Sequence, residues 1–383
     1  MSHDADLVIH RSLAPHVIPG SRVRVVFHPG ALAEIGPIAR AEGATRALLV
    51  SDQGIVDAGH VETAMRSLYK TGIVTRLYDG VAENPTTTHV HRGLAIARKF
   101  EVDFIIGLGG GSSMDCAKGI NFLLTNGGQV ADYWGVNKAA KPLLPLIAIP
   151  TTAGTGSEAQ SAALISDPET HVKMACWDEK AAARVAILDP DLTRTQPKRV
   201  AAATGIDAVT HAVESAASTK RTPVSVRFSA RAWELLSGAF ERAIGSAPDD
   251  AAREDMLLGA HLAGCAIENS MLGAAHACAN PLTAKFDMVH GLAVGCMMPH
   301  VVRYNSAGAD HPYGDLGLSP DALAARLDAL LVAGGLPRRL RDAGVTEDAI
   351  PGLAEMAAKQ WTAAFNPRKV GAGELAEIYR MAR

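Results

Sequence analysis

The sequence predicts an α/β domain built on a parallel sheet, followed by an all-helical domain. In the first half of the 383-residue chain, short runs of apolar and β-branched residues alternate with stretches of helical periodicity. Beyond about residue 193, apolar residues recur mostly at three- and four-residue spacing, and strand signals are sparse. We therefore expect two domains, residues 1–190 and 191–383, in keeping with the number that this length favours.

The first domain is expected to hold strands where short apolar runs end in polar or glycine turns, with helices between them on both faces of the sheet. The run at 44–52 is continuously apolar, as in a strand buried on both faces. The expected strands are residues 21–27, 44–52, 74–81, 102–110 and 142–152. The expected helices lie within residues 28–43, 61–72, 86–101 and 112–124. Residues 163–180 are interpreted as a hairpin, and residues 185–193 as a crossing segment.

The second domain is expected to be helical throughout. Apolar residues follow the i, i+3, i+4 pattern in four stretches, namely residues 199–218, 225–245, 249–273 and 291–305. Residues 311–320 have the composition of a loop and precede a further helical pair.

Composition excludes several classes of protein. Hydrophobic residues make up 48% and charged residues 20% of the chain, and the formal net charge is −3. Without a basic excess, nucleic acids and anionic membranes are not expected partners. No apolar stretch is long enough to span a bilayer, and the N-terminus lacks the pattern of a secretory signal. The five cysteines form no Cys-x-x-Cys pair, which favours reduced thiols and a cytoplasmic location.

Two loops at the ends of predicted strands are candidate phosphate-binding elements. Residues 109–112, Gly-Gly-Gly-Ser, join a buried strand to a helix, whose N-terminal N–H groups suit a pyrophosphate. Residues 151–158, TTAGTGSE, follow the next buried strand and offer hydroxyl groups. Tight packing for the first loop, and helix capping for the second, remain the alternatives. Asp52 ends another strand, where an acid can accept from ribose hydroxyls and favour NAD over NADP, although a turn-initiating aspartate is equally consistent.

Asp207, His211, His276 and His290 form a candidate metal site. Asp207 and His211 lie four residues apart on a predicted helix and therefore share a face. His276 and His290 lie in apolar surroundings and are separated by Pro281 and the FDM turn (286–288), so they are not expected to share one regular helix. One carboxylate and three imidazoles suit Fe(II), Zn(II), Mn(II) or Ni(II) better than Ca(II). An ordinary i, i+4 contact for the first pair, and core histidines bonded to carbonyls for the others, are the alternatives.

Taken together, these motifs resemble the iron-containing (group III) alcohol dehydrogenase family. The similarity covers nearly the whole chain, and the stretches that carry it include IGLGGGSSMDCAKG (106–119), AIPTTAGTGSE (148–158), ATGIDAVTHAVES (203–215), MLGAAHACANPL (271–282), VHGLAVGCMMPHVVRYN (289–305) and NPRKV (366–370). The resemblance implies a dehydroquinate synthase-like fold: a Rossmann-like, dinucleotide-binding α/β domain and an all-helical domain, with the active site in the cleft between them. It also implies homodimers or larger homo-oligomers.

The resemblance assigns roles to individual residues. By position, Asp207, His211, His276 and His290 match the family's metal ligands, for Fe(II) or Zn(II). The positions that match contacts to NAD(H) are Asp52, Asn84, Gly110, Gly111, Ser112, Thr151, Thr152, Thr155 and Lys173. NADP(H) is disfavoured by the carboxylate of Asp52.

One position departs from the family pattern. Many relatives carry a second histidine four residues after the third ligand, near the nicotinamide, where it is thought to assist proton transfer. Here that residue is Asn280, whose amide does not titrate near neutral pH but can still orient a water or a substrate oxygen. Glu268 is an alternative proton relay, or simply a solvated or capping carboxylate.

The resemblance and the motifs together predict a metal-dependent NAD(H) alcohol dehydrogenase or aldehyde reductase acting on a small primary alcohol or aldehyde. The alternatives are a family member with a different small oxo- or hydroxy-acid substrate, a dehydroquinate synthase-like lyase that uses bound NAD, and a non-catalytic NAD-binding protein. The lyase would need a cluster of basic residues for a phosphorylated substrate, and the second half shows Lys220 and Arg221 but no convincing basic cluster near the ligands. Intact ligands argue against the non-catalytic alternative.

Overall fold

The computed structural model describes residues 11–170, 172–247, 249–307 and 311–383. Contacts between Cα atoms divide the chain into two compact units. The α/β unit comprises the described residues up to Thr152 together with Gly156–Gln196, and the helical unit comprises Ala153–Thr155 and Pro197–Arg383. Within the described ranges, no helix combines the length and the apolarity that a membrane crossing requires.

The α/β unit is built on a seven-stranded sheet in the order β1-β2-β10-β7-β5-β3-β4. All neighbours pair in parallel except β1 with β2. The strands are β1 (Ser12–Val17), β2 (Arg24–Phe27), β3 (Arg46–Val50), β4 (Val74–Tyr78), β5 (Phe104–Gly109), β7 (Leu146–Pro150) and β10 (Val185–Leu188). Every residue of β5, β7 and β10 is buried, which accounts for their continuous apolar sequences.

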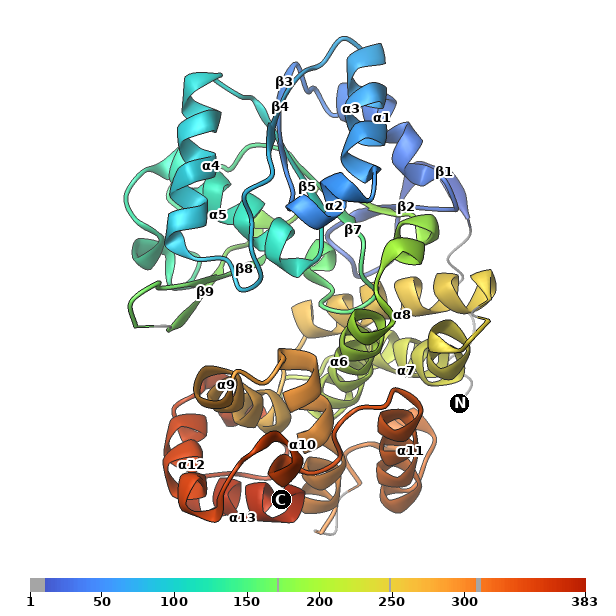
Figure 1. The fold of residues 1–383 in the computed structure, drawn as a ribbon, viewed down its shortest axis with the longest axis vertical. Coiled ribbons are helices and arrows are strands. Elements are labelled where there is room, and N and C mark those ends of the chain that lie inside the picture. Colours follow the sequence, from blue (N-terminus) through green and yellow to red (C-terminus); the bar gives the residue numbers. More distant parts are fainter. Residues whose placement is uncertain (1–10, 171, 248, 308–310) are drawn as a thin grey trace. The chain divides into compact units, whose positions relative to one another are not determined.

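Helices cover both faces of this sheet, as the sequence predicts (Figure 1). They are α1 (Ile35–Ala41), α2 (Gln53–Asp57), α3 (His60–Lys70), α4 (Thr87–Lys99) and α5 (Gly111–Asn126). Alternate strand residues such as Leu49, Ile106 and Ile147 share one core with apolar residues of α1 and α3. On the other face, α5 packs against α4 and β5. The carboxyl ends of the parallel strands therefore lie at one edge of the sheet.

Two details of this unit differ from the sequence-based expectation. The segment expected to cross after the hairpin is β10, which inserts between β2 and β7 as a further parallel strand. Its four apolar residues are too few to display a period, so only the pairing partners on both sides identify it as a central strand. The edge strand β1 was not expected, because Pro15 interrupts its pattern.

A second sheet contains β6 (Gly135–Val136), β9 (Lys173–Trp177) and β8 (Ala162–Ser166) in that order. Strands β8 and β9 pair antiparallel, from Ala162 opposite Trp177 to Ser166 opposite Lys173. The hairpin expected over residues 163–180 is thus confirmed.

The helical unit is organised around α6 (Lys198–Ala217), which packs against α7, α8 and α10. From Gly205 to its end every residue of α6 is buried, because alanine, valine and isoleucine face the surrounding helices on all sides. The remaining helices are α7 (Pro223–Ile244), α8 (Asp250–Glu268), α9 (Ala274–Phe286), α10 (His290–Asn305), α11 (Pro320–Ala333), α12 (Ile350–Ala358) and α13 (Ala372–Ala382).

Two glycines allow α10 to approach α6 closely. A β-carbon built on Gly291 would lie 2.0 Å from the carbonyl oxygen of Ala203, and one built on Gly295 would lie 2.9 Å from Ile206. These glycines stand one helical turn apart and so face the same neighbour. The β-carbon of Asp207 lies 3.3 Å from the same point beside Gly291. The close packing therefore also sets how near the start of α10 comes to Asp207.

We expect Gly291→Ala to lower the free energy of unfolding by roughly 2–3 kcal/mol, because the new methyl group must push a backbone carbonyl away. Gly238→Ala is the matched control, since Gly238 lies on an exposed face of α7 with no atom within 4 Å of an added β-carbon. That change should raise stability by roughly 0.5–1 kcal/mol through helix propensity. Urea denaturation of both variants gives the comparison, and equal stabilities would contradict the close approach.

Candidate metal centre and nucleotide loops

Helix α6 places Asp207 and His211 one turn apart on the same face. Each residue is only 5% exposed, although its neighbours in the helix are mostly apolar. Nε2 of His211 lies 3.5 Å from Oδ1 of Asp207. Two such polar groups inside an alanine-rich helix need partners from other elements, because a buried charge without compensation is costly.

The partners come from two further helices. His276 is the third residue of α9, and His290 is the first residue of α10. The two histidines do lie on different helices, as expected, and the break falls at the FDM turn, while Pro281 is accommodated within α9. The helix ends at Phe286, where Asp287 adopts a left-handed conformation with φ of 50°. A short connection then directs His290 back toward His276.

Asp207, His276 and His290 each offer one ligand atom, and these atoms lie within 4.8 Å of one another. Nε2 of His276 stands 3.6 Å from Oδ1 of Asp207. His211 is outside this group of three but adjoins it, with its ring stacked on that of His276 at 4.9 Å between centroids. The rings of His276 and His290 are 5.4 Å apart. The four residues singled out in the sequence therefore do come together.

The donor set fits a divalent transition metal. Oδ1 of Asp207 and Nε2 of His276 are buried without a hydrogen-bond partner in the described chain. Buried polar atoms are normally satisfied, so this pair calls for a cation or an ordered water. A hard carboxylate oxygen beside borderline imidazole nitrogens is the donor chemistry that Fe(II) and Zn(II) accept.

Electrostatics make the cluster receptive to positive charge. Burial acts against ionisation of Asp207, but His211, His276 and His290 outweigh it and hold the carboxyl pKa below its ordinary value. For His276, burial disfavours the proton, yet Glu214 and Asp207 raise the imidazole pKa to about 9. Burial dominates at His211 and lowers its pKa, even though Asp207 acts in the opposite direction. Asp207 is therefore ionised near neutral pH.

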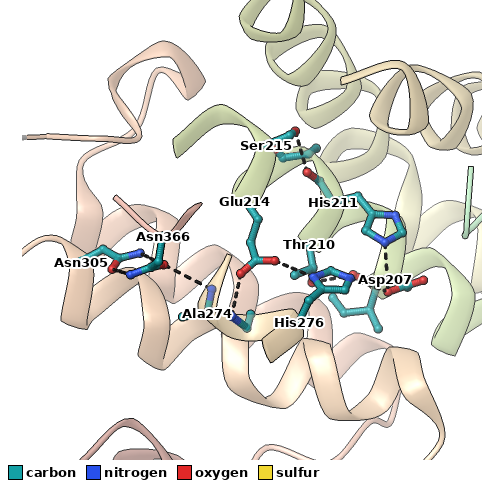
Figure 2. A network of polar contacts seen from close by, with 12 residues as sticks. Asp207, Thr210, His211, Glu214, Ser215, Ala274, His276, Asn305 and Asn366 are labelled. Atoms are coloured by element: carbon teal, nitrogen blue, oxygen red, sulfur yellow. Dashed lines mark hydrogen bonds and ion pairs between the residues drawn. The ribbon is translucent and has the colours of Figure 1, made fainter. Parts of the chain in front are cut away.

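Glu214 is a member of the cluster that sequence reasoning did not single out. It lies on α6, is 4% exposed, and extends toward the start of α9 (Figure 2). Its Oε2 lies 2.5 Å from Nδ1 of His276, and its Oε1 accepts from the backbone N–H of Ala275 at 2.6 Å. The signal was available in the spacing, because residues 207, 211 and 214 recur at i, i+4 and i+7 and so share one helix face.

Asn280 and Glu268 occupy distinct places in this unit. Asn280 lies one turn after His276 on α9, is half-buried, and donates from Nδ2 to Oε1 of Gln360 at 2.9 Å. Its amide is thus held by a second amide and not by a titratable group. Glu268 is the half-buried last residue of α8.

In the α/β unit, the first glycine loop links β5 to α5. Gly109 has φ of +149°, and a β-carbon there would lie 2.6 Å from Oγ of Ser113 and 3.2 Å from Oδ2 of Asp52. Only glycine fits this position. Gly110 is the N-cap of α5, and Gly111 and Ser112 are its first two residues. Their N–H groups belong to the helix end that suits anions.

Asp52 lies beside this loop. Its Oδ1 caps α2 by accepting from the N–H of Ile55, and its Oδ2 accepts from Oγ of Ser113 at 3.1 Å. The capping role and the proximity to the glycine loop therefore coexist, and the two interpretations of Asp52 do not exclude each other.

The second loop starts directly next to the first. The N–H of Thr151 donates to the carbonyl of Gly109 at 3.0 Å, and Thr152 lies against Gly110. Thr155 belongs to the short segment that groups with the helical unit, where Gly154 packs closely on Thr204. Within the α/β unit, Thr151 and Thr152 thus lie beside the glycine loop.

A buried lysine fixes the chain that follows this loop. Lys118 of α5 is fully buried and donates from Nζ to the carbonyl oxygens of Ser157, Gln160 and Ala162 at 2.7–2.9 Å. Oγ of Ser157 in turn donates to the buried carboxylate of Asp115 at 2.6 Å. In the sequence, the aspartate and the lysine of this network stand three residues apart in the DCAKG stretch that follows the glycine loop.

Asn84 and Lys173, which only the family resemblance pointed to, are joined to each other. Nζ of Lys173 donates to Oδ1 of Asn84 at 3.0 Å. Asn84 adopts a left-handed conformation with φ of 52°, which asparagine tolerates better than most residues. The pair is half-buried, so the lysine charge is held at a defined place.

Comparison with known proteins agrees with these features. The family model for iron-containing alcohol dehydrogenase matches residues 22–190, and that for the C-terminal part of the Fe-containing alcohol dehydrogenase family matches residues 201–383. The 1,3-propanediol dehydrogenase of Klebsiella pneumoniae is 37% identical over 371 residues, which is 93% of this chain and 96% of the relative.

Solved structures show the same fold. An alcohol dehydrogenase from Oenococcus oeni has a TM-score of 0.91 at 31% identity, covering 95% of this chain and 98% of the other. The sulfoacetaldehyde reductase from Bifidobacterium kashiwanohense, solved in complex with NAD+, has a TM-score of 0.86 at 28% identity, covering 94% and 97%. Both the fold class and the resemblance inferred from the motifs are confirmed. The chain belongs to the iron-containing alcohol dehydrogenase family, a family of oxidoreductases acting on CH–OH groups.

Proposed function

We propose that this protein is a metal-dependent NAD(H) alcohol dehydrogenase or aldehyde reductase for a small primary alcohol or aldehyde. The observation that carries the proposal is the convergence of the buried Asp207 and His276 with the half-buried His290, where Oδ1 of Asp207 and Nε2 of His276 have no hydrogen-bond partner among the described residues. We propose these three residues and His211 as the ligands of Fe(II) or Zn(II). The named relatives, which include a propanediol dehydrogenase, support a small substrate.

When bound, the metal would act as a Lewis acid on the substrate oxygen, and NAD(H) would exchange a hydride with the carbon that bears it. Asp207 supplies the negative charge that offsets a cation. The three imidazoles would add neutral donors, and the burial of His211 and His276 limits the access of bulk water to the charge. Helix α6 holds two of the four donors on a single buried helix, which limits their movement relative to one another.

We propose that the α/β unit binds the cofactor through the edge of the sheet where β3, β5 and β7 end. The N-terminus of α5 would receive the pyrophosphate, and Asp52 would accept from the adenosine ribose. The proposed contacts are Asp52, Asn84, Gly110, Gly111, Ser112, Thr151, Thr152, Thr155 and Lys173. The relative solved with NAD+ supports this choice of cofactor.

Asn280 is proposed to orient the substrate oxygen or a water, and not to transfer a proton. Its Nδ2 is engaged by Gln360, so its Oδ1 is the atom available to accept from a hydroxyl group. An amide in this position does not titrate, which means that proton exchange must use another group or solvent.

The decisive test measures nicotinamide absorbance with metal-free protein, and again after loading with Fe(II) under anaerobic conditions or with Zn(II). Short primary alcohols and aldehydes serve as the substrate panel. We expect metal-dependent turnover, and a loss on the order of 10²- to 10³-fold in His290→Ala, because several kcal/mol of transition-state stabilisation depend on the metal. His91→Ala, on an exposed position of α4, should retain activity. Turnover that is indifferent to metal would reject the proposal.

The choice of NAD over NADP should depend on the charge of Asp52. Asp52→Asn keeps an oxygen that caps α2 but removes the repulsion of a 2′-phosphate. We expect the ratio of kcat/KM for NADP(H) to that for NAD(H) to rise roughly tenfold, which corresponds to about 1.4 kcal/mol. The control is Asp57→Asn, at an exposed position in the same helix. A ratio unchanged by Asp52→Asn would remove this residue from the cofactor site.

Truncation of Asn280 should affect catalysis while leaving metal binding intact. We expect Asn280→Ala to lower kcat/KM roughly tenfold, the value of one lost hydrogen bond of about 1.4 kcal/mol. Gln360→Ala, which retains the Asn280 amide but frees its Nδ2, should cause a smaller loss. Elemental analysis checks that both variants keep the metal. Equal activity of wild type and Asn280→Ala would show that the amide takes no part.

A further inference from the structure

Glu214 is a buried carboxylate with both oxygens committed. Oε1 accepts from the backbone N–H of Ala275, and Oε2 lies 2.5 Å from Nδ1 of His276 (Figure 2). Both donors belong to the first turn of α9, whereas Glu214 belongs to α6. One side chain thus connects the helix that carries Asp207 with the helix that carries His276.

The contact with His276 determines which ring nitrogen carries a proton. An ionised carboxylate only accepts hydrogen bonds, so Nδ1 of the facing imidazole must be protonated. In a neutral ring this leaves Nε2 as the lone-pair nitrogen. Nε2 is the atom that lies 3.6 Å from Oδ1 of Asp207 and has no hydrogen-bond partner. When the ring is neutral, its lone pair is therefore directed at the proposed metal position.

The start of α9 is secured from a second side by Asn366. Its Oδ1 accepts from the N–H of Ala274 at 3.3 Å, and its Nδ2 donates to Oδ1 of Asn305 at 2.7 Å and to the carbonyl of Arg368 at 2.6 Å. Helix N-termini leave such N–H groups without partners inside the helix, and negative charge there is favourable. On α9, Asn366 bonds the backbone of Ala274, whereas Glu214 reaches both the backbone of Ala275 and the imidazole of His276.

We propose that Glu214 is a positioning residue, which fixes the tautomer and the direction of the His276 ring so that Nε2 is presented to the metal. This inference rests on the proposed function, in which His276 is a ligand. Glu214 itself does not ligate the metal or contact the reacting atoms. Metal-bound histidines commonly donate their second nitrogen to a carboxylate, and loss of such a partner typically weakens metal binding by about 10- to 100-fold.

The competing explanation is that Glu214 merely caps α9, and Glu214→Gln separates the two roles. Glutamine has nearly the same shape but offers one acceptor and one donor, while Ala275 and His276 present two donors. It must either leave one donor unsatisfied or force the His276 proton to Nε2. We expect the affinity of metal-free protein for Zn²⁺, measured against a chromophoric chelator, to fall by about 10- to 100-fold.

Asn366→Ala is the matched control for a purely structural effect. It removes the hydrogen bond to Ala274 but leaves the carboxylate that faces the imidazole. We expect it to lower the Tm of the metal-free protein while Zn²⁺ affinity stays near the wild-type value. Co²⁺ adds a spectroscopic measure, because its visible d–d absorption reports the arrangement of the ligands and should change in Glu214→Gln but not in Asn366→Ala.

A measurement on the wild type keeps the proposal testable even if Glu214→Gln fails to fold. In ¹⁵N-histidine spectra of the Zn²⁺-loaded protein, with the His276 signals identified by their loss in His276→Asn, Nδ1 should carry the proton and Nε2 should bind the metal. The opposite tautomer, or undiminished Zn²⁺ affinity in folded Glu214→Gln, would overturn the inference alone. Absence of Zn²⁺ binding in the wild type would instead overturn the proposed function on which it rests.

Discussion

The burial of three ionisable side chains on one face of α6 is the constraint on which the candidate site depends. Asp207, His211 and Glu214 occupy successive turns of the part of α6 that is buried on all sides and otherwise mostly apolar. Burying such groups is unfavourable unless each finds a partner. The partners are supplied by the first residues of α9 and α10, so the polar face of α6 determines where these two helices must begin. The glycines of α10 then allow the approach that this arrangement requires.

The α/β unit uses a buried charge in a similar way. Lys118 and Asp115 lie inside α5, directly after the glycine loop, and bind the chain that follows the second loop. Burial raises the pKa of Asp115, while Lys118 and the hydrogen bond from Ser157 act against that effect. Loops that must present backbone groups to a ligand cannot be held by a hydrophobic core of their own. In both units, buried charged side chains on a helix hold the neighbouring chain in place.

The sequence predicted the parts of the structure that depend on local pattern. Alternating apolar runs revealed the parallel sheet, and the i, i+4 spacing placed Asp207 and His211 on one face. The sequence did not predict the features that depend on contacts between residues far apart in the chain. Four apolar residues do not reveal that β10 pairs on both sides, and Pro281 does not break α9, which ends only at the FDM turn. Glu214 was missed because a glutamate on a helix is usually solvated, and only the packing of α9 shows that it is buried.

The proposed metal also bears on the stability of the helical unit, because burying the polar groups of its site is unfavourable. Without a cation, the unit buries an ionised carboxylate whose Oδ1 and a neighbouring imidazole nitrogen lack hydrogen-bond partners. The proton that Glu214 and Asp207 favour on His276 compensates part of this charge. Under the proposed function, a metal would replace that proton, satisfy both atoms and bind only the folded arrangement, so its binding free energy would add to the free energy of unfolding. A site assembled from three helices would therefore couple the binding of the ion to the packing of α6, α9 and α10.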